Sequence, residues 1–485
     1  MEVLILVLSF IILLSIGVPI AFSIGLSGII TMLFSIDSIP AFTTFAHRMA
    51  TGLDSFALLA IPFFILAGNI MNSGGIAIRL INLARLLVGR LPGGLAMVNV
   101  SANMLFGAIS GSAAASASAI GSIMAPEMRK EGYPDSFSTA VNITSATTGL
   151  TIPPSNILIV YSLASGGASI TALFLAGYIP GIMSGIAIML TAVSMLIYKT
   201  RGVRGIGRML SKLALLTFFI TGAAIGLKLF YSNTPAGVHR IVFPLFGLAL
   251  LSYLVVKIIR KWDKAKYAAR IFIDALPSLF MLIIVIGGIV AGYFTATEAS
   301  AVAVLYALTL AFIYKQVGIK DLPGIILKSV RTTAIVLLLV STSIGLSWIM
   351  SYENIPQNVS EALLNLSNNP FVILLIINLI LLFVGIFMDM TPAVLIFTPI
   401  FLPVVTTQLG MDPIHFGIIM VLNLCVGLCT PPVGSVLFIG CSVTGIKIEK
   451  VIKPLIPIFI AMIVVLLLVT YIPKLSLWLP NLVLK

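Results

Sequence analysis

Two hydrophobic blocks, one in each half of the chain, share landmarks at nearly the same spacing. The first block reads FGAISGSAAASASAIGSIMAP from Phe106 to Pro126, followed by GLTIPPSN from Gly149. The second reads FVGIFMDMTPAVLIFTPIFLP from Phe383 to Pro403, followed by GLCTPPVGS from Gly427. Phe and Pro lie 20 residues apart in both blocks, and the Gly-Leu-x-x-Pro-Pro motif begins 23 and 24 residues after that Pro. This spacing predicts two structurally similar halves.

The composition indicates a membrane protein. The chain is 60% hydrophobic and only 9% charged, and its mean hydropathy of +1.18 excludes an ordinary soluble domain. Apolar runs near the ~20 residues that cross a bilayer recur along its length, so we expect an all-α polytopic protein. The first run, Val3 to Leu14, lacks a basic flank and a cleavage site and is predicted to be a retained helix. The three cysteines, in or beside apolar segments, suggest neither a disulfide framework nor a zinc site.

The formal charge of +13 predicts membrane topology, not binding of nucleic acid, because the basic residues gather in a few loops. These loops are expected to be cytoplasmic: Arg79 to Arg90, Arg129 with Lys130, Lys199 to Lys212, Lys257 to Arg270, Lys315 to Arg331, and Lys447 to Lys453. The intervening loops hold few basic residues and are expected to face outward.

This topology predicts two re-entrant hairpins. Both ends of 91–128 are basic and therefore cytoplasmic, yet the segment is too short for two full spans at ~1.5 Å per residue across ~30 Å of hydrocarbon. A hairpin that opens to the cytoplasm, with its tip near Ser110, Gly111 and Ser112, fits this length. By the same reasoning, 370–407 forms a hairpin that opens to the exterior, with its tip between Met388 and Thr391.

After each hairpin we expect a broken helix, 136–164 in the first half and 415–440 in the second. Two adjacent prolines remove two backbone donors, so the carbonyls just before them lose their helical partners. Bare backbone at membrane depth is tolerated where it lines a cavity or is buried in protein. Such carbonyls, with hydroxyls of the hairpin tip, supply oxygen ligands for a cation, and the half-helix that follows presents its N-terminus to an anion.

Each feature also has a simpler interpretation. Runs of small residues are typical of close helix packing, and a single Pro-Pro pair is typical of a kink. The repetition of both features, in matched order and opposite orientation, favours a transport site between inverted repeats.

The candidate residues form three groups. The first cation site comprises Ser110, Gly111, Ser112, Gly149 and Ile152, and the second comprises Met388, Asp389, Thr391, Gly427 and Thr430. An anionic substrate is expected to meet Ser155, Asn156 and Ser435, because the hairpins and broken helices contain no Arg or Lys.

Several motifs, in a fixed order, resemble the large membrane subunit of tripartite ATP-independent periplasmic (TRAP) transporters. They are LAIPFFILAGNIM from Leu59, the two repeated blocks, LFLAGYIPGI from Leu173 and GGIVAGYFTATEASAVAV from Gly287. The resemblance covers residues 1 to about 200 and about 270 to 485. It implies an elevator-type secondary transporter, not an enzyme, that uses a sodium gradient to take up an organic acid such as a C4-dicarboxylate or a sialic acid. It also implies a bacterial inner membrane location, a small four-helix membrane subunit and a periplasmic substrate-binding protein, with Na⁺ as the coupling ion at both cation sites.

The resemblance divides the chain into a first inverted repeat, 1–200, an inserted pair of transmembrane helices, 201–270, and a second inverted repeat, 271–485. The inserted helices, 213–231 and 241–259, depart from the family pattern and are expected to be peripheral. Three other functions are weighed: a standalone sodium/carboxylate symporter that needs no binding protein, a channel and an intramembrane protease. A channel needs a continuous polar pore, and a protease needs a catalytic partner for Ser110, Ser112 or Asp389, and the sequence indicates neither.

A few charged residues near membrane depth remain as candidates. Asp389 is expected to support its hairpin tip more than to bind an ion directly. Glu298 is expected to cap a helix, Asp274 to pair with Arg270, and Lys228 to extend toward the membrane surface.

Overall fold

The computed structural model describes residues 2–199, 202, 262–367, 369–431 and 434–484. The inserted pair that the sequence predicts at 213–231 and 241–259, together with Lys228, lies outside the described residues. The regular structure within the described ranges is helical, and eight of these helices are long and apolar enough to cross a membrane. The all-α, polytopic character predicted from composition is therefore confirmed.

The first half comprises α1 (Glu2–Ser15), α2 (Ile20–Ser35), α3 (Ser38–Gly52), η1 (Phe56–Leu59), α4 (Ala60–Ser73), α5 (Ile76–Val88), α6 (Gly94–Ser110), α7 (Ala113–Lys130), α8 (Asp135–Thr151), α9 (Asn156–Ala164) and the helix Ile170–Lys199. The second half comprises α12 (Trp262–Val290), α13 (Ala296–Ile313), η2 (Ile319–Asp321), α14 (Leu322–Tyr352), α15 (Ile355–Leu366), α16 (Pro370–Phe387), α17 (Met390–Pro403), η3 (Val404–Gln408), α18 (Pro413–Gly427), α19 (Ser435–Thr444), α20 (Ile448–Tyr471) and α21 (Lys474–Val483).

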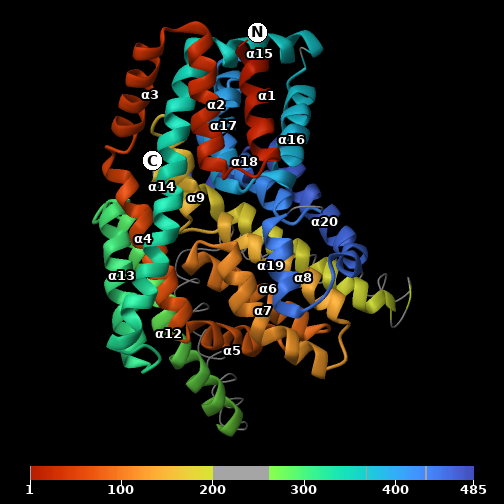
Figure 1. The fold of residues 1–485 in the computed structure, drawn as a ribbon. Helices are drawn as coiled ribbons and strands as arrows, with labels where there is room; N and C mark the ends of the chain where they lie inside the picture. Colours follow the sequence, from red (N-terminus) through yellow and green to blue (C-terminus); the bar gives the residue numbers. More distant parts are fainter. Residues whose placement is uncertain (1, 200–201, 203–261, 368, 432–433, 485) are drawn as a thin grey trace, which may run out of the picture.

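Two helical hairpins stand in opposite halves of the molecule. Hairpin α6–α7 lies in the lower half of Figure 1 and turns at Gly111, whose positive φ of 60° suits a residue without a Cβ. Hairpin α16–α17 lies in the upper half and turns at Met388 and Asp389. The second hairpin ends in a short π-helical segment, η3, which carries it one residue beyond the predicted end at residue 407.

The packing of these elements follows one scheme in both halves. Within each half, the first arm of the hairpin packs on the first part of the following helix pair, α6 on α8 and α16 on α18. Between the halves, the second arm packs on the other half's short helix, α7 on α19 and α17 on α9. Contacts between α8 and α18 join the two halves at the centre. Each hairpin is therefore held by elements of both halves.

A pair of glycines permits the close approach within each half. A Cβ built on Gly107 would lie 2.6 Å from the Cα of Gly149, and one built on Gly427 would lie 2.6 Å from the Cα of Gly385. The two members of each pair are 42 residues apart in the sequence, 107 to 149 and 385 to 427. Because contact at this distance leaves no room for a side chain, each crossing requires glycine on both helices.

Buried amides hold the hairpins to the neighbouring helices. In the first half the Asn103 amide donates to Asn142 Oδ1 at 3.1 Å and to Ser145 Oγ at 2.9 Å, and its carbonyl oxygen accepts from Ser116 Oγ at 2.7 Å. These bonds join α6, α7 and α8. Since the side chains are fully or almost fully buried, their hydrogen bonds satisfy polar groups that water does not reach.

The second half uses a corresponding pair of amides. Asn423 of α18 donates to Asn378 Oδ1 of α16 at 2.8 Å, and Asn378 donates to Thr470 Oγ1 of α20 at 3.2 Å. The amide contact thus recurs in the second half with different neighbours.

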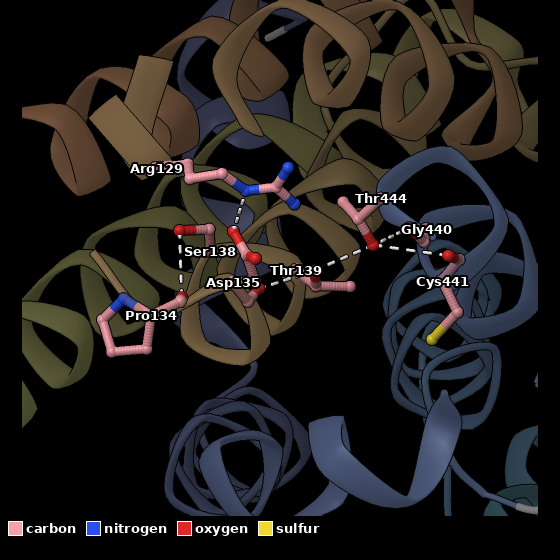
Figure 2. A network of polar contacts seen from close by, with 8 residues as sticks. All are labelled: Arg129, Pro134, Asp135, Ser138, Thr139, Gly440, Cys441 and Thr444. Carbon is pink, nitrogen blue, oxygen red and sulfur yellow. Dashed lines mark hydrogen bonds and ion pairs between the residues drawn. The ribbon is translucent and has the colours of Figure 1, made fainter. Parts of the chain in front are cut away.

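Two further contacts join the halves at the ends of the broken helices. Thr139, near the start of α8, donates to Thr444 Oγ1, at the end of α19, across 3.0 Å (Figure 2). Tyr161 of α9 donates to the carbonyl oxygen of Pro413, the first residue of α18, across 2.6 Å. In both places the short second helix of one half reaches the start of the broken helix of the other half.

The glycine crossings predict a graded loss of stability. In Gly107→Ala the added methyl would lie 2.6 Å from Gly149, whereas in Gly385→Ala it would lie 3.0 Å from Gly427. We expect Gly107→Ala to lower stability by about 1–3 kcal/mol through overpacking, and Gly385→Ala to lower it less. The melting temperature of the purified protein in detergent measures both effects.

Gly324→Ala is the matched control, because this glycine is also helical and a Cβ on it would meet no heavy atom within 4 Å. We expect its melting temperature to stay the same or rise, since alanine favours the helix. Equal melting temperatures for Gly107→Ala and Gly324→Ala would contradict the tight crossing.

Candidate ion and substrate sites

The first helix break consists of residues 152–155, between α8 and α9. Pro153 and Pro154 have no N–H, so the carbonyls of Gly149 and Leu150 lack their helical donors. The Ser155 hydroxyl donates to the Leu150 carbonyl in place of Pro154. The Gly149 carbonyl, which lacks the N–H of Pro153, is therefore the oxygen most available to another ligand.

The first hairpin tip lies against this break. A Cβ on Gly111 would be 3.2 Å from Asn156 Nδ2 and 3.5 Å from the carbonyl oxygen of Pro154. Ser112 caps α7 by accepting a hydrogen bond from the Ala115 N–H at 3.2 Å. The carbonyl of Ser110 faces α4, where a Cβ on Gly68 would lie 2.8 Å from its oxygen.

The residues predicted for the first cation site are therefore adjacent at the level of the backbone. Gly149 touches α6 one helical turn before the tip, and Ile152 continues into the break. The Ile152 side chain packs toward Gly181 of the helix Ile170–Lys199, where a Cβ would lie 2.5 Å from Ile152 Cγ1. Because this side chain is a hydrocarbon, the backbone carbonyl is the only oxygen that Ile152 offers to a cation.

The second break follows α18 at Gly427, and α19 begins at Ser435. The Gly427 carbonyl accepts from the Thr430 N–H at 2.9 Å, which replaces the donor that Pro431 lacks. Thr430 Oγ1 donates to the Val426 carbonyl at 2.9 Å, so its remaining lone pair stays available. A Cβ on Gly434 would lie 2.4 Å from the Leu428 carbonyl oxygen and 2.9 Å from that of Thr430, so both oxygens face the end of this loop.

The second tip carries a carboxylate. Asp389 precedes α17, is exposed, and makes no side-chain hydrogen bond to cap that helix. Its Oδ1 instead accepts from Ser435 Oγ at 3.3 Å. Met388 is buried beside it, and Thr391 is half-buried in the first turn of α17.

The three residues predicted to bind substrate fall into two places. Ser155 and Asn156 adjoin the first tip, whereas Ser435 adjoins the second. Ser155 is fully buried and occupied by the Leu150 carbonyl, so its hydroxyl supports the break. Asn156 and Ser435 occupy equivalent positions, since each is the first residue of the short helix and each meets a hairpin tip.

A polar seam lies between α8 and α18 at the centre of the molecule. Cys425 Sγ donates to the Thr147 carbonyl at 3.3 Å, and Cys429 Sγ donates to the Ile143 carbonyl at 3.7 Å. A small internal cavity beside them is lined by Thr147, Thr148, Thr151, Ser184, Leu422, Cys425, Val426 and Met462. These thiols pack as buried donors.

The other charged candidates have ordinary structural roles. Glu298 and Thr295 form a capping box at the start of α13, as the sequence predicts. The predicted pairing of Asp274 with Arg270 is wrong, because within the described residues the ion pairs are Arg85 with Glu127 and Arg129 with Asp135.

Coordination by carboxylates, imidazoles and thiols is not indicated for the described part of the chain, where no group of three or more His, Cys, Asp or Glu side chains could hold a metal ion. The breaks and tips instead present backbone carbonyls and hydroxyls. The sequence reasoning overlooked the buried asparagines and the glycine pairs. Polar residues inside apolar helices, and the repeated 42-residue glycine spacing, were the signals that pointed to them.

The fold and these breaks define a polytopic helical membrane protein of the transporter class. The chain matches the family model described as the tripartite ATP-independent periplasmic transporter, DctM component, over residues 7–475, and it belongs to this family. The family resemblance predicted from the sequence is thereby confirmed, and with it the conclusion that the protein is a transporter component and not an enzyme.

Three relatives illustrate the match. The chain is 51% identical to the uncharacterized protein YgiK of Salmonella typhimurium, over 98% of this chain and 96% of the relative. It is 35% identical to the C4-dicarboxylate TRAP transporter large permease protein DctM of Rhodobacter capsulatus, over 96% of each. It is 37% identical to the isethionate TRAP transporter permease protein DctMQ of Oleidesulfovibrio alaskensis, over 96% of this chain and 64% of that longer relative.

Among solved structures, the fold is similar to that of the YdaH transporter of Alcanivorax borkumensis. The TM-score is 0.58 at 13% sequence identity, and the match covers 92% of this chain and 90% of the other. This likeness concerns the fold alone.

Ser155 provides a test of the first break. Ser155→Ala would remove the donor to the Leu150 carbonyl inside a fully buried loop. We expect a loss of about 1–3 kcal/mol, seen as a lower melting temperature, because the carbonyl would be left unpaired.

Ser122→Ala serves as the control, since Ser122 is exposed on α7 and donates only to the Ala119 carbonyl within its own helix. It should change stability by less than about 0.5 kcal/mol. If Ser155→Ala melts at the same temperature as Ser122→Ala, the Ser155 hydroxyl does not stabilise the break.

Proposed function

We propose that this protein is the transport subunit of a sodium-coupled, binding-protein-dependent uptake system for an organic acid. The observation that carries the proposal is the pairing, in both halves, of a hairpin tip with a proline-broken helix in a member of the tripartite family. Each pairing offers backbone carbonyls and hydroxyls to a cation and the start of a short helix to an anion.

Sodium fits the ligands at both places. The candidate oxygens are neutral carbonyls and hydroxyls near Gly149 and Ser112 in the first half and near Gly427 and Thr430 in the second. A bound Na⁺ needs no proton to leave such groups, whereas proton coupling would require a titratable side chain at the site. Asp389 at the second tip is the one carboxylate among the candidate residues, and its bond to Ser435 supports a role in holding the tip.

An organic acid is supported by chemistry and by the relatives. Asn156 and Ser435 begin the short helices, where N–H groups and the helix dipole favour negative charge. The DctM relative is named for C4-dicarboxylates and the DctMQ relative for isethionate, which are both small organic anions. Neutralisation by a bound cation next to the helix start replaces the Arg or Lys that the hairpin tips and breaks lack.

The partners follow from family membership. We propose that the chain assembles with a small four-helix membrane subunit and receives substrate from a periplasmic binding protein, in the bacterial inner membrane. The tripartite description of the family supports this arrangement over a standalone symporter.

The movement that we propose is of the elevator type, with each hairpin re-entering the membrane from its own side. The alternating packing of α7 on α19 and α17 on α9 ties both hairpins to both broken helices. This central body can therefore move as one unit against the remaining helices.

Sodium dependence tests the coupling. In proteoliposomes that contain the full transporter and its binding protein, an inward sodium gradient should drive substrate uptake. Ser112→Ala and Thr430→Ala should each raise the half-saturating sodium concentration about fivefold, as expected when one ligand worth ~1 kcal/mol is lost.

Ser122→Ala is again the matched control, and all rates are normalised to folded protein. Equal uptake without sodium, under a proton gradient alone, would disprove the coupling. Uptake that needs no binding protein would instead favour the standalone symporter.

Cysteine labelling tests the orientation. In a version without Cys425, Cys429 and Cys441, a single cysteine at Asn358 should react with an impermeant thiol reagent from outside. Cysteines at Lys130 and Lys450 should react only after the membrane is opened. All three positions are exposed in the structure, so access depends on the membrane side. Labelling of position 130 from outside would contradict the prediction that the first hairpin opens to the cytoplasm.

A further inference from the structure

A basic cleft lies where the start of α8 meets the turn between α19 and α20. Its walls include Asp135 and Ser136 on one side and Lys447, Lys450 and Lys453 on the other. The two sides belong to different halves of the chain and are joined nearby by the bond between Thr139 and Thr444 (Figure 2). The cleft is therefore built on a fixed joint of the core and not on a free loop.

The positive charge of this cleft is not neutralised by its neighbours. Asp135 is engaged by Arg129, whose Nε lies 2.7 Å from the Asp135 carboxylate (Figure 2). Among the residues that the structure describes, no ion pair involves Lys447, Lys450 or Lys453. Glu449 is the remaining carboxylate in the lining, so three ammonium groups face one unpaired acid. An anion is the complementary ligand.

The lysines continue into an apolar face of the same helix. Lys447, Lys450 and Lys453 follow one another at intervals of three, and Ile456, Ile460, Val464 and Leu468 follow at intervals of three or four. Lys447 directly precedes α20, and this spacing places the other six on one side of the helix. The four apolar side chains are 42–55% exposed. From Lys453 to Leu468 the helix rises ~22 Å at 1.5 Å per residue, which is more than one leaflet of a ~30 Å hydrocarbon core.

We propose that this cleft binds the headgroup of an anionic phospholipid, with an acyl chain along the exposed apolar face of α20. The lysines bind the phosphate group of the lipid, and its acyl chain covers the apolar face of α20. A free phosphate ion would bind the lysines but leave that face uncovered. Basic pockets at the cytoplasmic side of membrane helices suit such headgroups. The lipid bridges α8 and α20, one from each half, and stabilises the joint between them.

Native mass spectrometry of the purified, delipidated protein provides the test, with phosphatidylglycerol as the ligand and phosphatidylcholine as the neutral comparison. We expect phosphatidylglycerol to bind more tightly, and each Lys→Gln change at 447, 450 or 453 to weaken it about fivefold. Lys447→Arg, Lys450→Arg and Lys453→Arg together should retain binding, since the charge is kept.

A second basic group provides the matched control. Lys315, Lys320 and Lys328 are equally exposed, and their triple change to Gln removes the same charge elsewhere. It should leave phosphatidylglycerol binding within about twofold of the unmodified protein. An equal loss in this control would overturn the site in favour of general attraction between the basic surface and the lipid.

Two soluble competitors separate the lipid from other anions. Inorganic phosphate or succinate, added at millimolar concentration, should not displace phosphatidylglycerol. Displacement by phosphate would mean a free-anion site, and displacement by succinate would mean a carboxylate site; either would overturn the proposal. Because the readout is lipid binding alone, it is independent of sodium-coupled uptake, and the two proposals can fail separately.

Discussion

The absence of two backbone donors in the middle of each broken helix is the constraint on which the rest of the structure depends. Pro153 with Pro154, and Pro431 with Pro432, leave carbonyls that a regular helix would satisfy. Unpaired carbonyls are costly inside a membrane, so the surrounding elements must either pair them or give them a ligand. Ser155 and the Thr430 N–H pair some of them, and each hairpin tip meets the first residue of the short helix that follows the break.

The glycine crossings make that covering possible. Gly107 on Gly149, and Gly385 on Gly427, bring the first arm of each hairpin to backbone distance from the helix just before its break. The buried amides of Asn103 and Asn378 then hold the same helices together along their length. The prolines leave carbonyls without donors, the glycine crossings bring the hairpin close to them, and the buried amides hold the hairpin in place.

The sequence predicts those parts of the site that depend on residues with special backbone requirements. Proline excludes a helical donor and Gly111 suits a positive φ, so the breaks and the first tip are readable without a structure. Contacts between distant side chains are not readable in this way. The partners of Asn103 lie on two other helices, α7 and α8, and Tyr161 bonds to Pro413 some 250 residues away, which only the folded arrangement reveals. For the same reason the three predicted substrate residues proved to lie at two tips.

The recurrence of the same contacts in both halves has a consequence for the history of the chain. The packing of each hairpin's first arm, α6 on α8 and α16 on α18, is the same in the two halves, and the contacts between the halves, α7 on α19 and α17 on α9, exchange roles in the way that two-fold symmetry requires. Two copies of a half-length ancestor, inserted into the bilayer in opposite directions, would therefore bury the same surfaces as an antiparallel homodimer. Gene duplication and fusion of such a dual-topology protein would then have freed each copy to diverge, as Gly111 and Asp389 have done at equivalent tips.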